Sequence, residues 1–462
     1  MSTTGTAGTH ERRLHTLSLV SWDEKRYDIR DQYIALTYSE SITSSYCSGD
    51  LILLDAVDFP TLLPMIGEER VQAKFSKIDF NDPLGVNEFL PISFDMSVYR
   101  MDGKSIAGGS RKKQLYKIFF ASRSAFINHD KVIYASYKSM RYSDMVKKIY
   151  EDYIKEDGPN YKPLIIEETK YTADFYVQGL SPTKAIQEIC KRSVSAEDNG
   201  SVYIFYEDRD AYNFVTIQKL LKKESKITLS CELKNILKDG SVHRELDLER
   251  QSLNADVYSQ QASFDIFQSI KSGEGTSSLL AIDPTLRKFY YEEFDLREND
   301  NAGQENWSKY SKISTKKPWT KNNKMFVNPR ANLSVLITDV EWSTDDIIAK
   351  KSSESPSDSR KDIYLERMSM LKQIQKTVLN VTVAGHPNIK AGDIITFKVP
   401  ENSGASLSGQ KPEEEDKWIS GKFLVWAVSH VIENDEYLMG LKLIKDGFET
   451  DIFHRDPTEY GE

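Results

Sequence analysis

Two aspartates, Asp208 and Asp210, come closest to a catalytic pair, because glycoside hydrolysis uses two neighbouring carboxyl groups. They stand in the polar segment Glu207-Asp208-Arg209-Asp210 between two apolar runs, where a solvated turn is the stronger interpretation. The sequence contains no HExxH, GxSxG, P-loop or GxGxxG pattern, and the segment Gly273-Glu274-Gly275 lacks a third glycine. We therefore expect no catalytic residue, no cofactor and no enzymatic activity.

Metal ligands do not gather at the spacing that a metal site needs. The segment 79–82 begins like a calcium loop, but Pro83 follows it and Leu90 occupies the position of the bidentate glutamate. The seven histidines have no Cys, His or acidic neighbour at zinc spacing. We expect each histidine at the surface or in a hydrogen bond. The sequence also predicts no metal site and reduced side chains at the three widely spaced cysteines, Cys47, Cys190 and Cys231.

The composition is that of a soluble globular protein, with 39% hydrophobic and 28% charged residues in 462. This length suggests two to four domains. No apolar run is long enough to span a bilayer, and residues 1–13 lack the apolar region of a secretory signal, so we expect a chain made and kept in a cytoplasm. The net charge of −9 argues against a surface that clamps nucleic acid, but a weakly acidic pore would let DNA slide.

Residues 14–122 predict an all-β barrel. Apolar segments recur at the spacing of one strand plus one turn, at 14–20, 33–39, 51–54, 71–75, 92–99 and 114–121. The breaks between them carry turn residues at 48–50, 81–85 and 103–109.

Residues 123–229 change to helical periodicity and predict an α/β insertion. Ser143 is expected to cap a helix whose buried face runs from Met145 to Ile154. A second helix is predicted after Gly179, with Ser181 as its cap and Pro182 at its first position. Its buried stripe consists of Ala185, Ile186, Ile189 and Cys190, and a strand over 202–206 follows.

Residues 363–450 predict a helix followed by a second small antiparallel barrel or sandwich. Strands are expected over 378–383, 394–399, 423–432 and 437–445, with a tight turn between the first two. That turn contains Gly385, Pro387, Gly392 and Asp393, residue types suited to turns. Residues 350–362 have the composition of a polar linker that proteases should cut first, and 401–417 that of a solvated or partner-binding loop.

The order of these segments resembles that of baseplate hub proteins of contractile-tailed bacteriophages, a class that includes the hub part of VgrG proteins. Three segments carry the resemblance: the "GxPxIxxGD" turn at 385–393, the "GLSP" helix start at 179–182, and residues 263–284. The structural signature positions are Gly179, Ser181, Pro182, Gly385, Pro387, Gly392 and Asp393. The resemblance implies a mainly β fold with two antiparallel tube-type barrels and two α+β insertions. The second barrel would combine 230–283 with 363–450, and the second insertion would cover 284–362.

The resemblance also implies a homotrimeric ring that adapts a threefold spike to a sixfold tail tube and leaves a channel for DNA. Its expected partners are further copies of itself, a central spike protein, tail tube or tube-initiator proteins and a tape-measure protein, with DNA passing without specific binding and no membrane-spanning segment. The expected location is the virion baseplate, after assembly in the host cytoplasm. Seventeen residues follow Lys445, too few for a spike module, so we expect a separate spike chain. A tail-associated cell-wall hydrolase and a carbohydrate-binding β-protein remain alternatives.

Overall fold

The computed structural model describes the chain in segments separated by short and long gaps. These segments are residues 13–62, 65–77, 89–106, 113–156, 158, 161–197, 200–231, 253–262, 267, 276–283, 288–295, 332–337, 367–374, 377–399, 415–416, 419–433 and 436–445. Most of their regular structure is antiparallel sheet, so the prediction of a mainly β fold is confirmed. The polar linker predicted at 350–362 and most of the loop at 401–417 lie outside the described residues.

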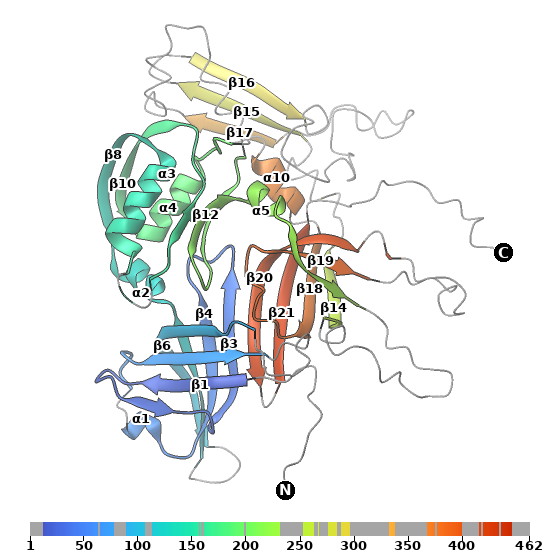
Figure 1. Ribbon diagram of the computed structural model, residues 1–462. Coiled ribbons are helices and arrows are strands. Elements are labelled where there is room, and N and C mark those ends of the chain that lie inside the picture. The colour runs from blue at the N-terminus through green and yellow to red at the C-terminus, as the bar shows by residue number, and fades with distance from the viewer. Residues whose placement is uncertain are drawn as a thin grey trace, which may run out of the picture.

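The first barrel is a strongly curved sheet that encloses one apolar core (Figure 1). Its strands follow the order β2-β1-β5-β6-β7-β4-β3, all antiparallel. Side chains alternate between the core and the outer face because successive strand residues point to opposite sides. The elements are β1 Arg13–Val20, β2 Arg26–Asp28, β3 Tyr33–Ser41, β4 Ser48–Asp55, α1 Phe59–Leu62, β5 Arg70–Ser76, β6 Ile92–Ile106 and β7 Gln114–Ala121.

The insertion packs helices against a two-stranded and a three-stranded sheet around a second core (Figure 1). The stripe predicted from Ala185 to Cys190 is buried, with Ile189 fully enclosed. The elements are α2 Arg123–Asp130, β8 Ile133–Arg141, α3 Tyr142–Ile149, the π-helix η1 Tyr150–Ile154, β9 Leu164–Ile166, β10 Thr172–Leu180, α4 Pro182–Cys190, β11 Tyr203–Glu207, β12 Tyr212–Thr216 and α5 Ile217–Leu221.

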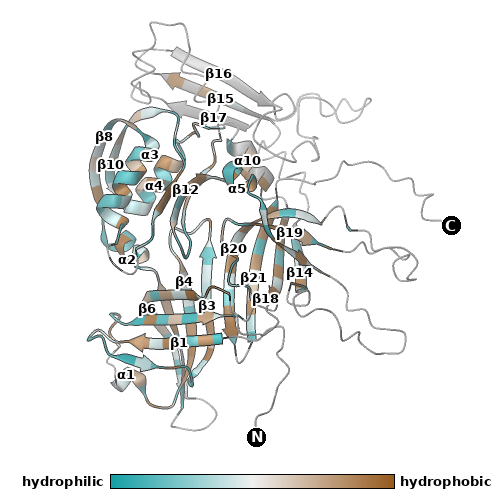
Figure 2. Ribbon diagram, viewed as in Figure 1, coloured by the Kyte–Doolittle hydropathy of each residue, from teal (hydrophilic) through white to brown (hydrophobic). Residues whose placement is uncertain are grey.

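The second barrel is built from strands that are far apart in the sequence. The order is β14-β18-β21-β20-β19-β13, and a single bridge between Ser230 and Asn254 joins its two ends. Figure 2 shows apolar and polar residues alternating along β18, β20 and β21. The elements are β13 Ser225–Ser230, β14 Ala255–Ala262, α10 Arg367–Ile374, β18 Thr377–Ala384, β19 Ile394–Lys398, β20 Gly421–Glu433 and β21 Glu436–Lys445.

The two barrels share one 13-stranded sheet, because β3 of the first pairs with β20 of the second. This antiparallel ladder runs from the pair Ala427 and Ser41 to the pair Glu433 and Ala35. The first core also contains Ile432 and Tyr437 from the second barrel. The two barrels therefore lie side by side, joined by a continuous ladder and a shared core.

The structure corrects several local predictions. Gly49, expected in a turn, lies inside β4, where a Cβ atom would stand 2.5 Å from the Phe120 ring. Helix α3 begins at Tyr142 with Arg141 as its cap, so Ser143 is already helical. Strand β13 pairs with β19 in parallel, an exception to the antiparallel second barrel.

The segment predicted to complete the second barrel divides between two sheets. Strand β14 joins that barrel, but β15 (Thr276–Asp283) pairs with β16 (Lys288–Asp295) and β17 (Asn332–Ile337) in a separate three-stranded sheet. Of the resembling segment 263–284, only residue 267 and 276–283 are described. The domain limits as a whole therefore stay predictions.

We predict that Ile189→Asp lowers the free energy of unfolding by roughly 3 kcal/mol or more, since it buries an unpaired charge and removes packing. Ile189 lies on α4 and is fully buried in the apolar core of the insertion. Chemical denaturation followed by fluorescence measures the change. Lys184→Asp on the exposed face of the same helix is the control, and equal stabilities of the two variants would contradict the packing.

Candidate functional site: a buried polar junction

The predicted signature residues occupy two places in the fold. Gly179, Ser181 and Pro182 lie where β10 passes into α4, whereas Gly385, Pro387, Gly392 and Asp393 lie in the turn between β18 and β19. Ser181 is the N-cap of α4, but its hydroxyl forms no hydrogen bond with any residue that the structure describes. Asn128 of α2 accepts the hydrogen bond of the Thr183 N–H at 3.2 Å instead.

Two glycines let the turn approach aromatic rings at contact distance. A Cβ atom on Gly385 would lie 2.3 Å from Cγ of Tyr437 in β21. Gly392 has a φ of +83°, and a Cβ there would lie 2.2 Å from Oη of Tyr206 in β11. At Gly392, only glycine tolerates both the positive φ and the close contact. The turn therefore packs directly on the insertion.

Asp393 closes the turn from within. Its Oδ2 accepts hydrogen bonds from the backbone N–H of Lys390 at 3.0 Å and from Nζ of Lys226 at 2.9 Å. The Asp393 side chain is 10% exposed, so these charge-assisted bonds are sheltered from water. Lys226 belongs to β13, which pairs with β19, and Asp393 therefore ties the turn to this neighbouring strand of the second barrel.

Lys390 reaches out of the turn to the insertion. Its Nζ lies 3.2 Å from Oδ2 of Asp208 and 3.0 Å from Oδ2 of Asp210, both in the connection between β11 and β12. Burial disfavours the ammonium charge, but attraction to the two carboxylates outweighs it and raises the pKa of Lys390. The two ion pairs of Lys390 join the second barrel to the insertion.

The prediction of a solvated turn at Asp208 and Asp210 is wrong for Asp208. Its side chain is 2% exposed, whereas that of Asp210 is 63% exposed. The Asp208 carboxylate accepts hydrogen bonds from the N–H groups of Asp210 and Ala211 and from Nδ2 of Asn213, at 2.7 to 2.9 Å. Asp208 therefore holds the hairpin in shape, which is a structural role.

Glu207 connects the same hairpin to the first barrel. It is 1% exposed, and its Oε1 accepts a hydrogen bond from Nζ of Lys162 at 2.7 Å. Its Oε2 accepts from the hydroxyls of Ser122 and Ser124, at 2.6 and 2.8 Å, and from the backbone N–H of Cys47 at 3.3 Å. Both oxygens of this buried carboxylate thus accept hydrogen bonds, one at Oε1 and three at Oε2.

Lys162 balances the buried charge of Glu207. Its Nζ also donates to the carbonyl oxygen of Asp208 at 2.8 Å. Burial alone would lower the pKa of Lys162, but its anionic neighbours raise it above the ordinary value. We call Lys162, Glu207, Asp208, Asp210 and Lys390 the polar junction, because these residues tie the insertion to both barrels.

A seam of buried polar groups lies beside the polar junction, where β3 meets β20. Glu40 is 1% exposed, and its Oε2 accepts from the N–H of Ala391 at 3.3 Å. Burial raises the pKa of Glu40, and the nearby Arg209 guanidinium opposes that rise. Tyr437 and His430 form a hydrogen bond of 2.8 Å on the same seam.

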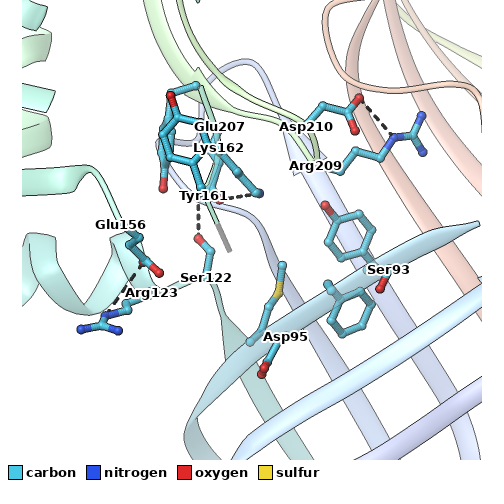
Figure 3. A pocket seen from close by; sticks show the side chains of 14 residues that line it. Ser93, Asp95, Ser122, Arg123, Glu156, Tyr161, Lys162, Glu207, Arg209 and Asp210 are labelled. Atoms are coloured by element: carbon cyan, nitrogen blue, oxygen red, sulfur yellow. Dashed lines mark hydrogen bonds and ion pairs between the residues drawn. The ribbon is translucent and has the colours of Figure 1, made fainter. Parts of the chain in front are cut away.

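A cavity of about 160 Å³ opens between the insertion and the first barrel (Figure 3). Four carboxylates line it, and a glycoside hydrolase uses two such groups as a catalytic pair. Glu207 is bound to Lys162, and Asp95 Oδ2 accepts from Arg70 and Gln72 at 3.0 and 2.7 Å. The other lining carboxylates are Asp210, paired with Lys390, and Glu156, 3.9 Å from Arg123.

This arrangement of paired carboxylates fits a role in holding the insertion and the barrels together better than a catalytic role. The carboxylates of Glu207, Asp95 and Asp210 each accept hydrogen bonds from cationic or polar side chains, which leaves them fewer lone pairs with which to take a proton. Within the described residues, no group of three His, Cys, Asp or Glu side chains could hold a metal ion. No helix of the described residues is long and apolar enough to cross a bilayer.

Sequence reasoning did not single out Glu207 or Lys162. A signal for Glu207 exists, because it continues the face of Tyr203 and Phe205 at a spacing of two residues, and that face is buried. Lys162 offers no comparable signal. Its burial depends on a hairpin that comes about 45 residues later in the chain.

Comparison with solved structures identifies the fold. A tail protein from Neisseria meningitidis MC58 has a TM-score of 0.52 and 10% identity, covering 93% of this chain and 96% of that protein. A 43 kDa tail protein of prophage MuSo2 from Shewanella oneidensis has a TM-score of 0.51 and 9% identity, covering 94% and 99%. No protein-family model and no curated protein matches by sequence. The chain shares the fold of these two tail proteins.

Proposed function

We propose that this chain is the structural baseplate hub of a contractile phage tail. Three copies form a ring that adapts a threefold central spike to a sixfold tail tube, with a channel left for DNA. The observation that carries the proposal is the presence of two barrels in one chain, joined strand to strand through β3 and β20. Three such chains offer six barrels to a sixfold partner while they keep a closed threefold ring.

The polar junction supports this role because an adaptor must hold its two barrels at a fixed angle. Glu207 binds the insertion to the first barrel, and Lys390 binds it to the second. The insertion thus holds the two barrels in a fixed orientation relative to each other. The proposed domains are 14–122 and 230–283 with 363–450 for the barrels, and 123–229 and 284–362 for the insertions.

The proposed partners are further copies of the chain, a spike protein, tail tube or tube-initiator proteins and a tape-measure protein. The proposed location is the tail baseplate, after assembly in the host cytoplasm. The similarity of fold to two tail proteins supports a place in a tail. The hydrolase alternative loses support because most of the carboxylates around the cavity are held in close ion pairs and hydrogen bonds.

Copy number in purified tails tests the proposal. Quantitative mass spectrometry should find three copies of this chain for each tail, half the number of subunits in one sixfold tube ring. Release of soluble sugars from purified cell walls by the isolated chain, or its absence from tails, would refute the structural role.

A further inference from the structure

The two-stranded sheet of the insertion has an open strand edge. β8 pairs with β10 and with no other strand that the structure describes. No further backbone hydrogen bond from another described residue reaches 133–138. Figure 1 places β8 at the outer rim of the molecule. Half of the backbone N–H and C=O groups of such a strand point away from its partner and are free to pair with another chain.

Residues 134–137 of this edge lack the features that protect another open edge among the described strands, the distal part of β6. Among the described strands, β6 pairs only with β7 beyond Val98, and it carries alternating charges at Arg100, Asp102 and Lys104. The β6 register shifts twice, and Gly103 has a φ of +72°. Charges and bulges of this kind keep an edge strand from pairing with other chains.

β8 has neither feature from Tyr134 to Tyr137, although its register with β10 shifts on both sides of this stretch and Ser139, at a φ of +49°, lies between the charged residues Lys138 and Arg141. From Ile133 to Tyr137 it carries no charge and no proline, and its register with β10 is regular from Tyr134 to Tyr137. β-branched and aromatic residues of this kind favour a pleated strand. This short, regular and uncharged stretch is the part of the open edge that can pair with another chain.

The outer face of the same sheet displays tyrosines. Tyr134 is 79% exposed and Tyr176 is 44% exposed, while Ile133 and Tyr137 on the inner face are buried. A Cβ on Gly179 would lie 3.3 Å from Oη of Tyr134, so the ring lies against this glycine. Gly179 thus supports an aromatic ring beside the open edge. Large exposed aromatics at a fixed position are typical of contact surfaces.

We propose that the open edge of β8 binds an extended segment of a different protein of the same assembly, which adds to the sheet as a third strand. Its outward side chains would neighbour Tyr134 and Lys138, so an aromatic or β-branched residue suits the first position and an acidic residue the second. Lys131 and Lys138 are exposed, and neither has an ion pair with another described residue. Only the location of the partner, in the same assembly, rests on the proposed function.

Hydrogen exchange tests the proposal in the full chain. Amides of residues 133–138 that face away from β10 should exchange roughly ten-fold more slowly, or slower still, in purified tails than in the isolated chain. The distal amides of β6, from residue 99 to 106, should exchange at the same rate in both. Unchanged exchange of β8 in tails that do contain the chain would overturn the proposal without affecting the hub assignment.

Paired tyrosine variants separate the edge from general folding effects. Tyr134→Lys places a charge beside the β8 edge and should reduce incorporation of the chain into tails by roughly ten-fold. Tyr99→Lys, at a 53% exposed tyrosine on the β6 edge, should leave incorporation unchanged. Equal losses in the two variants would overturn the proposal. Protection of β8 in a trimer of this chain alone would also overturn it, since the occupant would then be a second copy.

Discussion

Glu207→Ala is expected to lower the free energy of unfolding by about 3 to 5 kcal/mol, because it leaves the buried ammonium of Lys162 without its carboxylate. Lys162 is 20% exposed and Glu207 only 1%, so water can replace little of the lost interaction. Ser122, Ser124 and the Cys47 N–H would lose their shared acceptor as well. Chemical denaturation with a two-state fit measures the change.

Two further variants assign that loss to the buried charge pair. Glu168→Ala removes one partner of a surface ion pair with Arg141, whose side chains are 70% and 48% exposed, and should cost about 1 kcal/mol or less. The double change of Glu207→Ala with Lys162→Met should cost clearly less than the sum of the single changes. Additive costs would show that the two residues do not stabilise one another.

Gly392→Ala is expected to destabilise the chain by roughly 3 kcal/mol, from backbone strain and a steric clash together. The φ of +83° disfavours any side chain, and the new Cβ would stand 2.2 Å from Oη of Tyr206. Thermal unfolding in the same buffer for both proteins gives the comparison. The clash also forces the turn away from the insertion, so Lys390 should lose its contact with Asp208.

Gly67→Ala separates the two contributions. Gly67 has a φ of +97°, and a Cβ atom there would have nothing within 4 Å, so alanine should cost about 1 kcal/mol from strain alone. Adding Tyr206→Phe to Gly392→Ala removes the clashing oxygen and should restore part of the stability. No recovery in this double variant would mean that Tyr206 does not press on the turn.

Periodicity predicted most strands of both barrels because each buries one face. In β18, Leu379, Val381 and Val383 are buried while Asn380 and Thr382 are exposed, as the alternation of residue types indicates. The buried stripe of α4 followed from the helical period in the same way. Signals of this kind are local, so one sequence is enough to detect them.

Features that depend on distant partners could not be predicted locally. Glycine is typical of turns, but Gly49 lies within β4, where the ring of Phe120 from β7 leaves no room for a side chain. Asp208 has the type of a surface residue, yet Lys390 and a tight hairpin bury it. The parallel pairing of β13 with β19 joins segments about 170 residues apart, which no short pattern reveals.

An electron cryomicroscopy reconstruction of the assembled tail tests the adaptor role most directly. The account predicts three copies of this chain in a closed ring, with six barrels around an axial opening of roughly 20 Å or more, wide enough for duplex DNA. A spike should occupy one side of that ring and the tail tube the other. A twofold or sixfold ring of this chain, or a trimer without an axial channel, would contradict the account.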